Sequence, residues 1–539
     1  MNESRGPQAP VESAYPMSDR VIPRLIDGAA NRWSGRIALT QGDQALSYAD
    51  LREEVAGRGA ALQDLGVGWQ QSVAIMLGNH LDNVLTWLGA TYQGRIQVNI
   101  NTAYRGSLLT HVLNDSAAEL LVLESEFVPR ILEIASSLQS LRTLVVRGDM
   151  PTAHAPFDVR PFADVATPGH GVREHEVEPW HVYGILYTSG TTGRSKGVVV
   201  SHVQPYSYCS PEYFRLADED DTILVTLPQF HIAGQWAGVL SALYVGAKAA
   251  LVESFSVSSF WDTVRAVGAT QTTVVSTMAD FLYRSPPGPQ DRDHPLRKIL
   301  MSPIIREIRE FEERFGVGVR PAYGQTELGS PVVGPIGDAR PGGCGWVRPD
   351  FAHRIVDEHD QDVEPGHAGE LVLRPDEPWS IMLGYHNQPE ATLAKWRNLW
   401  YHTGDTFREG ADGELYFVDR SDDVIRRRGE NVSSFEVEVE LREHPAVVEV
   451  AVVGVDSEHY EQEIKAYVVL RPDAAATPRE LFEFVRPRLP YFMVPRFIEV
   501  VEAFEKTPTQ RIQKGPLRTR SASDATWDAT AAGLSTRSE

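Results

Sequence analysis

The chain has 539 residues, of which 42% are hydrophobic and 23% charged, enough for more than one globular domain. Its formal net charge of −22 disfavours nonspecific binding to nucleic acid or to an anionic membrane. Two cysteines exclude a disulfide framework, and the polar N-terminus has no signal pattern, so we expect a cytoplasmic location. No apolar run is long enough for a membrane-spanning helix.

The first half of the chain is predicted to alternate strands with helices. Residues 48–65 have the pattern of an amphipathic helix, and residues 73–77 and 96–99 have that of hydrophobic strands around a second helix. This alternation is typical of a parallel α/β sheet. Further buried strands are expected at residues 120–123, 143–146, 223–226, 249–251 and 272–275, with helices at 257–267 and 306–315.

The second half of the chain predicts two further units. After about residue 341, short strands and the hairpin turn Asp412-Gly413 indicate a β-rich subdomain. From Ser421, two helix starts, one of them at Thr477-Pro478, alternate with strands and indicate an α+β unit. The predicted domains are a disordered N-terminus (1–18), a large domain (19–420), a small domain (421–518) and a disordered tail (519–539).

The segment 187–197 is the strongest functional signal in the sequence. It is rich in glycines and hydroxyl side chains, contains Arg194 and Lys196, and lies between hydrophobic strand sequences. Glycines let backbone N–H groups approach a ligand, hydroxyls donate hydrogen bonds and a lysine supplies a point charge, so the segment suits a polyphosphate. It does not match the G-x-x-x-x-G-K-[ST] pattern of P-loop NTPases. The structural alternative is a surface turn.

Two shorter stretches contain residues suited to a nucleotide. In residues 322–327, the aromatic ring of Tyr323 is suited to a nucleobase, the hydroxyl of Thr326 to a phosphate and the carboxylate of Glu327 to Mg²⁺. In residues 400–405, Asp405 follows a glycine, and its carboxylate can accept both hydroxyls of a ribose. The structural alternatives are an exposed turn and a surface Asx-turn.

Three more positions extend this pattern. Arg420 lies where the large unit gives way to the small one and can also reach a ribose; the alternative is a charged linker. His231 follows a strand and is a candidate for an acyl pocket; the alternative is a structural histidine. The basic segment 506–514 near the C-terminus is the last stretch of interest, with a solvated loop as its alternative.

In this order and spacing, the motifs resemble the adenylate-forming superfamily of acyl-CoA and aryl-CoA synthetases, firefly-type luciferases and peptide-synthetase adenylation domains. The resemblance covers residues 21–518, and residues 365–405 look most like the carnitine/crotonobetaine-CoA ligase type. It implies an α/β fold: a large N-terminal domain of two α/β subdomains plus a β-barrel-like subdomain, and a small mobile α+β C-terminal domain. It also implies two half-reactions, in which a carboxylate and ATP give acyl-AMP and pyrophosphate, and a thiol, usually CoA, then displaces AMP.

The resemblance assigns an expected role to each matched residue. The β- and γ-phosphates would contact Thr188, Ser189, Gly190, Thr191, Thr192, Gly193 and Lys196. Tyr323 would face adenine, Thr326 the α-phosphate and Glu327 the Mg²⁺, while Asp405 and Arg420 would hold the ribose near Phe417. Asp422 would be the hinge, and Gly429 would lie on the small-domain loop that enters the site for thioester formation. The acid pocket would draw on His231, Trp236, Ser302 and Gly324.

Two positions depart from the family pattern. The C-terminal motif usually ends in Gly-Lys, and its lysine contacts the reacting carboxylate and the α-phosphate; here the pair is Gln510-Arg511. Arginine keeps the positive charge but presents a planar fork instead of an ammonium. Three outcomes stay open: Arg511 serves as the catalytic cation, adenylation is slow, or the chemistry has shifted to an unusual acid or nucleophile. Residues 300–303 also replace a Gly-Gly-Ala-like run beside adenine.

The leading hypothesis is an ATP- and Mg²⁺-dependent acid–thiol ligase that joins a small acyl or aryl carboxylic acid to CoA. The first alternative is an adenylating enzyme with another acceptor or acid, such as a carrier-protein thiol, an amine, or nitrite activated for diazo formation. The second is a nucleotide-binding protein with weak catalytic activity. A homodimer is compatible with the sequence, and we expect no nucleic-acid partner.

Overall fold

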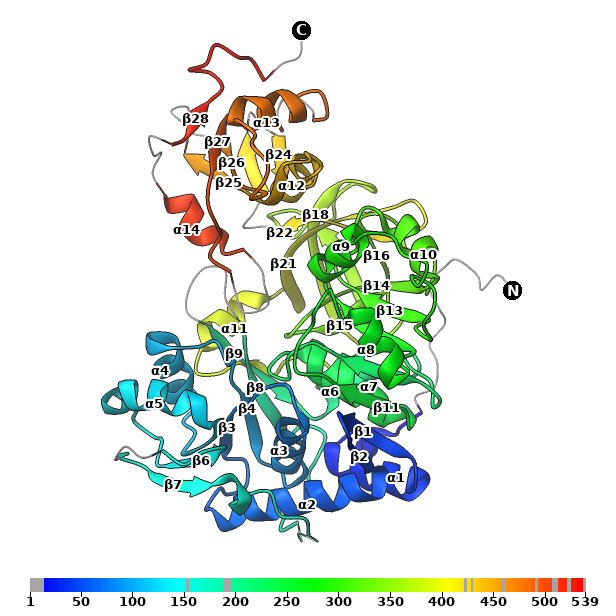
Figure 1. The fold of residues 1–539 in the computed structure, drawn as a ribbon, viewed down its shortest axis with the longest axis vertical. Coiled ribbons are helices and arrows are strands. Elements are labelled where there is room, and N and C mark those ends of the chain that lie inside the picture. The colour runs from blue at the N-terminus through cyan, green and yellow to red at the C-terminus, as the bar shows by residue number, and fades with distance from the viewer. Residues whose placement is uncertain are drawn as a thin grey trace.

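The computed structural model describes residues 14–536 apart from ten short gaps, and Figure 1 shows a large domain with a small one at its end. The gaps are residues 152–154, 170, 172, 189–194, 421–423, 428–429, 457–461, 490–492, 507–511 and 521–524. The predicted site residues Ser189, Gly190, Thr191, Thr192, Gly193, Asp422, Gly429 and Arg511 therefore lie outside the described residues.

The first sheet of the large domain is the predicted parallel α/β unit. Its eight strands run in the order β19-β9-β8-β4-β3-β5-β6-β7, parallel from β8 to β7, while β9 runs antiparallel to both β8 and β19. The strands are β3 (Ser72–Met76), β4 (Ile96–Asn99), β5 (Leu120–Glu124), β6 (Thr143–Arg147), β7 (Asp158–Pro161), β8 (Val182–Thr188), β9 (Lys196–Ser201) and β19 (Gly384–Tyr385).

Helices pack around this sheet and bury it. Helix α3 (Leu81–Tyr92) is buried along almost its whole length, because α2 (Tyr48–Asp64) packs against it. Helix α2 begins where the sequence predicts, with Ser47 and Asp50 forming a reciprocal capping box. The other helices of this half are α1 (Ile22–Trp33), α4 (Gly106–Asp115) and α5 (Val128–Ile134).

The second sheet of the large domain is parallel in one half and antiparallel in the other. Strand β14 (Gly318–Gln325) joins the halves, because it runs parallel to β13 and antiparallel to β15. The parallel half comprises β1 (Ile37–Gln41), β10 (Thr222–Val225), β11 (Lys248–Leu251), β12 (Gln271–Val274) and β13 (Lys298–Met301), with β2 (Gln44–Ser47) antiparallel at its edge. The antiparallel half comprises β15 (Gly329–Val333), β16 (Gly343–Val347), β17 (Phe351–Val356), β18 (Ala368–Pro375), β20 (Trp396–Arg397), β21 (Trp400–Glu409) and β22 (Leu415–Arg420). The predicted β-rich subdomain corresponds to this antiparallel half.

The helices that accompany the second sheet complete the large domain. They are α6 (Val203–Cys209), the π-helical segment η5 (Ala233–Leu240), α7 (Ser241–Val245), α8 (Phe260–Val267), α9 (Ser276–Arg284), α10 (Ile308–Phe315) and α11 (Pro389–Lys395). None of the helices in the described part of the chain combines the length and apolar character that a membrane crossing requires.

The small domain is an α+β unit with its own hydrophobic core. Its main sheet has the order β25-β26-β27-β28, and the hairpin β23–β24 packs beside it. The strands are β23 (Val424–Arg427), β24 (Glu430–Ser433), β25 (Val447–Asp456), β26 (Gln462–Leu470), β27 (Phe497–Val500) and β28 (Trp527–Asp528), and the helices are α12 (Ser434–Arg442), α13 (Pro478–Val485) and α14 (Lys514–Thr519). Helix α13 begins at the predicted helix start Thr477-Pro478, where Thr477 and Glu480 form a capping box. The predicted fold class is confirmed.

Both chain ends are more structured than the sequence predicts. Residues 14–18 belong to the large domain: the ring of Tyr15 lies 5.6 Å from that of Tyr206, and its hydroxyl donates to the carbonyl oxygen of Tyr244. Residues 527–528 form β28 beside β27, so the expected disorder of the 519–539 tail is wrong for this part of it.

The reason for the ordered tail is a buried ion pair that composition does not reveal. Lys465 Nζ and Glu499 Oε2 lie 2.8 Å apart inside the small domain, and both side chains are almost fully buried. Thr526 completes the pair, because its hydroxyl donates to Glu499 Oε2 and accepts from Lys465 Nζ. A buried charge pair needs such additional hydrogen bonds. Next to it, the Trp527 ring packs 5.4 Å from that of Phe482.

We predict that Trp527→Ala destabilises the small domain by roughly 1–3 kcal/mol, less than a fully buried tryptophan because this side chain is half-buried. Chemical unfolding followed by tryptophan-independent circular dichroism measures the change. The control is Val448→Ala, which removes an exposed apolar side chain from the same domain and is expected to change stability little. Equal stability of the Trp527 variant and the wild type would contradict a packed tail.

Candidate active site

The segment expected to bind phosphate joins two antiparallel strands. Thr188 ends β8 and Lys196 begins β9, and the two residues are direct cross-strand partners. Strand β8 is anchored by Tyr187, whose hydroxyl donates to Asp115 Oδ2 at 2.7 Å. The ammonium of Lys196 lies 5.1 Å above the ring of Tyr385 on the neighbouring strand β19. The strand pairing thus places Thr188 and Lys196 together at one edge of the first sheet.

Tyr323 and Asp405 meet through hydrogen bonds although 82 residues separate them. The Tyr323 hydroxyl donates to Asp405 Oδ2 at 2.6 Å, and Gln325 Nε2 donates to the same oxygen at 2.6 Å. Gln325 Nε2 also donates to the Tyr323 hydroxyl and to the carbonyl oxygen of Thr403, both at 3.0 Å. Tyr323 and Asp405 are buried, with 8% and 3% of their surfaces exposed. These bonds fix the carboxylate of Asp405 against the end of β14.

Aromatic rings support this pair from the side of β22. The Tyr323 ring packs edge-on at 4.7 Å from that of Phe407, which lies 5.5 Å from Phe417. In the pairing of β21 with β22, Asp405 stands directly opposite Arg420. The two residues predicted to hold a ribose are therefore backbone neighbours across the sheet.

Thr326 and Glu327 form the turn after β14, and a buried glutamine holds their backbone. Gln204 Nε2, on α6, donates to the carbonyl oxygens of Thr326 at 2.8 Å and Glu327 at 3.1 Å. The Glu327 carboxylate is half-buried, and its Oε1 accepts a 2.8 Å hydrogen bond from the Tyr385 hydroxyl. Burial raises the pKa of Tyr385, and the negative charge of Glu327 raises it further, so this hydroxyl remains a donor.

The carboxylate of Glu327 has the donor chemistry of a magnesium–nucleotide site. Mg²⁺ prefers oxygen ligands, keeps several waters and is commonly held by one or two carboxylates together with substrate phosphates. Among the described residues, no group of three or more His, Cys, Asp or Glu side chains is placed to hold a metal ion. Glu327 near Lys196 therefore fits a metal that arrives with a polyphosphate better than one bound by the protein alone.

Three of the four residues expected to bind the acid lie at the carboxyl ends of parallel strands in the second sheet. His231 follows β10, Ser302 follows β13 and Gly324 lies near the end of β14. In open α/β sheets, ligands bind beyond the carboxyl ends of the strands. The His231 Nδ1 accepts from the backbone N–H of Ala233 at 3.2 Å, which leaves the ring proton on Nε2. At Gly324 a Cβ would lie 2.1 Å from the Gly329 carbonyl oxygen, so only glycine fits.

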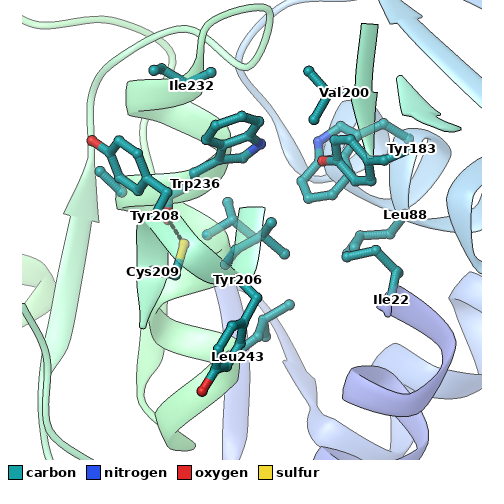
Figure 2. Close-up of a cluster of buried hydrophobic side chains, with 14 of the residues drawn as sticks. Ile22, Leu88, Tyr183, Val200, Tyr206, Tyr208, Cys209, Ile232, Trp236 and Leu243 are labelled. Carbon is teal, nitrogen blue, oxygen red and sulfur yellow. Dashed lines mark hydrogen bonds between the residues drawn. The ribbon is translucent and has the colours of Figure 1, made fainter. Parts of the chain in front are cut away.

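Trp236, the fourth of these residues, occupies a different environment. It is fully buried in the core between the two sheets, where its ring lies 5.6 Å from that of Tyr208 (Figure 2). Cys209 Sγ contacts the Trp236 carbonyl oxygen at 3.1 Å from below. Its packing is that of a core residue, and its expected role in the acid pocket stays a prediction.

Comparisons with known proteins agree with this geometry. Residues 26–386 match the AMP-binding enzyme family, and residues 436–511 match the AMP-binding enzyme C-terminal domain. The chain belongs to the AMP-binding enzyme family. Crotonobetaine/carnitine–CoA ligases of Salmonella arizonae and Salmonella typhimurium are 32% identical to it, over 88% of this chain and 93% of theirs.

Solved structures of the family share the whole fold. An anthranilate CoA ligase in complex with anthranoyl-AMP superposes with a TM-score of 0.83 at 24% identity, covering 96% of this chain and 99% of its own. A benzoate CoA ligase from Burkholderia xenovorans superposes with a TM-score of 0.80 at 25% identity, covering 92% and 99%. The adenylate-forming resemblance is thereby confirmed, and the chain is an enzyme of the acyl- and aryl-CoA ligase class.

Three side chains that contact predicted site residues carry no role in the sequence-based expectations. Gln325 lies inside a predicted stretch but carried no predicted role, although it bonds to Asp405. Gln204 and Tyr385 also carried no predicted role, yet they contact Thr326 and Glu327. No sequence motif marks Gln204, a polar residue in a helix whose residues are all buried.

We predict that Asp405→Asn lowers the affinity for AMP by about 10- to 100-fold, because the amide removes the charge and turns a donor toward Tyr323 or Gln325. Calorimetric titration with AMP measures the loss. The matched control is Asp362→Asn, where an exposed carboxylate pairs with Arg354 far from the site and no change is expected. Unchanged AMP affinity in the Asp405 variant would show that this carboxylate does not hold the nucleotide.

Proposed function

We propose that the enzyme is an ATP- and Mg²⁺-dependent acid–thiol ligase that activates a small acyl or aryl carboxylic acid and transfers it to CoA. The observation that carries the proposal is the convergence of Lys196, Glu327 and Asp405 from two sheets. Their chemistry matches the three charged parts of a magnesium nucleotide: phosphates, metal and ribose hydroxyls. The relatives named above, which are CoA ligases, support the choice of acceptor.

In the first half-reaction, an oxygen of the acid attacks the α-phosphorus of ATP, and the bond to the bridging oxygen breaks to release pyrophosphate. Thr188 and Lys196, which are cross-strand partners, would hold the leaving β- and γ-phosphates, and Thr326 would face the α-phosphate. Bound Mg²⁺, held by Glu327, would neutralise phosphate charge. Tyr323, Asp405 and Arg420 would hold the nucleoside, so that positioning and electrostatics lower the barrier.

In the second half-reaction, the sulfur of CoA attacks the acyl carbon and AMP leaves. Asp422, Gly429 and Arg511 belong to the small domain and are proposed as hinge, thioester-forming loop and catalytic cation, respectively. Contacts between the domains include an exposed ion pair of Arg306 with Glu440 at 3.3 Å. Exposed pairs of this kind contribute little free energy, so the interface is compatible with rotation of the small domain.

The acid pocket of the proposal lies beyond β10, β13 and β14. His231, Ser302 and Gly324 supply an imidazole, a hydroxyl and a close backbone approach, which suit a small acid with a polar or aromatic group. The partners that we propose are this acid and CoA, in the cytoplasm, where both CoA and ATP are supplied. A homodimer is compatible with the proposal and is checked by light scattering.

The proposal predicts acid-dependent release of pyrophosphate and AMP, with formation of one acyl-CoA for each pyrophosphate. A panel of small aliphatic and aromatic acids, with nitrite included, measures pyrophosphate release, and mass spectrometry identifies the product. Pyrophosphate release without acyl-CoA would retain adenylation but exclude the ligase assignment, and would direct the search to a carrier-protein thiol, an amine or nitrite. ATP binding without turnover on any acid would exclude both.

We further predict that Arg511→Lys keeps or raises the rate of acyl-AMP formation, because both side chains bring a cation to the reacting oxygens. Single-turnover formation of acyl-AMP measures the rate without the CoA step. Arg511→Met, which removes the charge, is expected to slow the same step by at least 10- to 100-fold. A several-fold loss in the lysine variant would mean that the guanidinium fork has a role of its own.

A further inference from the structure

Lys395 is a cation of the site region that none of the sequence motifs contains. It is the last residue of α11, the helix between β19, which carries Tyr385, and β21, which carries Asp405. The side chain is half-buried, and its Nζ donates to the carbonyl oxygen of Thr403 at 3.1 Å. Its Nζ lies 5.8 Å from the ring centroid of Tyr401. The ammonium therefore points inward from α11 toward the start of β21.

The surroundings of this ammonium are the proposed nucleotide site. The Thr403 carbonyl oxygen that accepts from Lys395 also accepts from Gln325 Nε2, which in turn donates to Asp405. A Cβ at Gly404 would lie 3.1 Å from Lys395 Nζ, so the absence of a side chain at Gly404 leaves room for the ammonium. Burial lowers the pKa of Lys395, while the nearby carboxylates of Glu327, Asp405 and Glu370 oppose this effect and Lys196 adds to it.

Unlike most lysines of this chain, Lys395 has no carboxylate partner at ion-pair distance among the described residues. Of the seven lysines, Lys298, Lys465, Lys506 and Lys514 have a carboxylate oxygen within 4.0 Å. Lys196, Lys248 and Lys395 have none among the described residues. Lys248 donates to the Val267 carbonyl oxygen away from the site. Of the other two, Lys395 lies near the carboxylates of Glu327 and Asp405, and Lys196 contacts the ring of Tyr385, whose hydroxyl donates to Glu327.

A purely structural role accounts for only part of this arrangement. The bond to Thr403 braces the segment between α11 and β21, but it uses one of the three N–H donors of the ammonium. The carboxylates of Glu327, Asp405 and Glu370 stabilise the ammonium from a distance, but among the described residues none of them forms an ion pair with it within 4.0 Å. A phosphate group is an acceptor that suits both the remaining donors of Lys395 and the neighbouring groups.

We propose that Lys395 binds the phosphate chain of the nucleotide and provides, with Lys196, a second cation from the large domain. The inference rests on the proposed nucleotide site. Because Lys395 belongs to the large domain, its charge is present whatever the position of the small domain, whereas Arg511 is carried by the small domain. Two fixed cations would bind the phosphates before the small domain supplies the third.

Binding of adenosine, AMP and ATP to the full-length protein separates this role from bracing. In Lys395→Met, we expect affinity for AMP, ATP or both to fall by about tenfold or more, with adenosine affinity unchanged, since adenosine has no phosphate. Lys395→Arg keeps the charge and is expected to retain most of the affinity. The matched control Lys248→Met removes an ammonium with a similar carbonyl contact and should leave all three affinities unchanged.

The outcomes distinguish the inference from the proposed function. Equal losses for adenosine and the nucleotides would show that Lys395 only positions Thr403 and Asp405, and unchanged affinities would show no contact; either overturns the inference while the proposed function stands. A wild-type protein that binds neither AMP nor ATP would overturn the proposed function, and the inference with it. If thermal unfolding shows that the methionine variant does not fold, Lys395→Gln replaces it, because glutamine keeps a donor for Thr403 without the charge. The same three affinities are then compared, with the same expected results.

Discussion

The hydrogen bonds that converge on the Asp405 carboxylate are the constraint on which the site depends. Tyr323 and Gln325 belong to β14, whereas Asp405 belongs to β21, and three strands (β15, β16 and β22) lie between them in the order of the sheet. Strand β14 is parallel to one neighbour and antiparallel to the other, so it links the α/β part of the large domain to its antiparallel part. A buried carboxylate that lost these donors would be strongly destabilised, which ties the geometry of the site to the integrity of the sheet.

A second set of buried polar bonds joins the two halves of the large domain. Gln235, on η5, accepts from Gln97 Nε2 and from the Tyr183 hydroxyl, both at 3.0 Å and both on the first sheet. Its own Nε2 donates to the Gln229 carbonyl oxygen, just before His231. The glutamines are buried, and Tyr183 belongs to the apolar cluster of the core (Figure 2), where unpaired polar atoms are costly. The network therefore fixes the first sheet, which carries Lys196, relative to the segment that carries His231.

The small domain is bound to this frame by weaker contacts. Phe435 on α12 lies 6.3 Å from the Phe417 ring, beside the aromatic support of Tyr323. The domain has its own core and its own buried ion pair, so much of what holds it together lies within the domain itself. A separate core suits a domain that would present different faces to the site in two half-reactions, with the cations of the large domain in fixed positions.

The family, the order of the strands and helices and the chemistry of the site were readable from the sequence, because glycine-rich loops, capping boxes and buried strand patterns are local signals. Thr188, Lys196, Tyr323, Thr326, Glu327 and Asp405 fall inside such signals. Tertiary structure alone decided which side chains support them. Gln204, Tyr385 and Lys395 form contacts across 8 to 123 residues of sequence, and Trp236 is a core residue although it lies close to His231 in the sequence. Long-range contacts of this kind depend on how strands from separate segments pair, which no local pattern records.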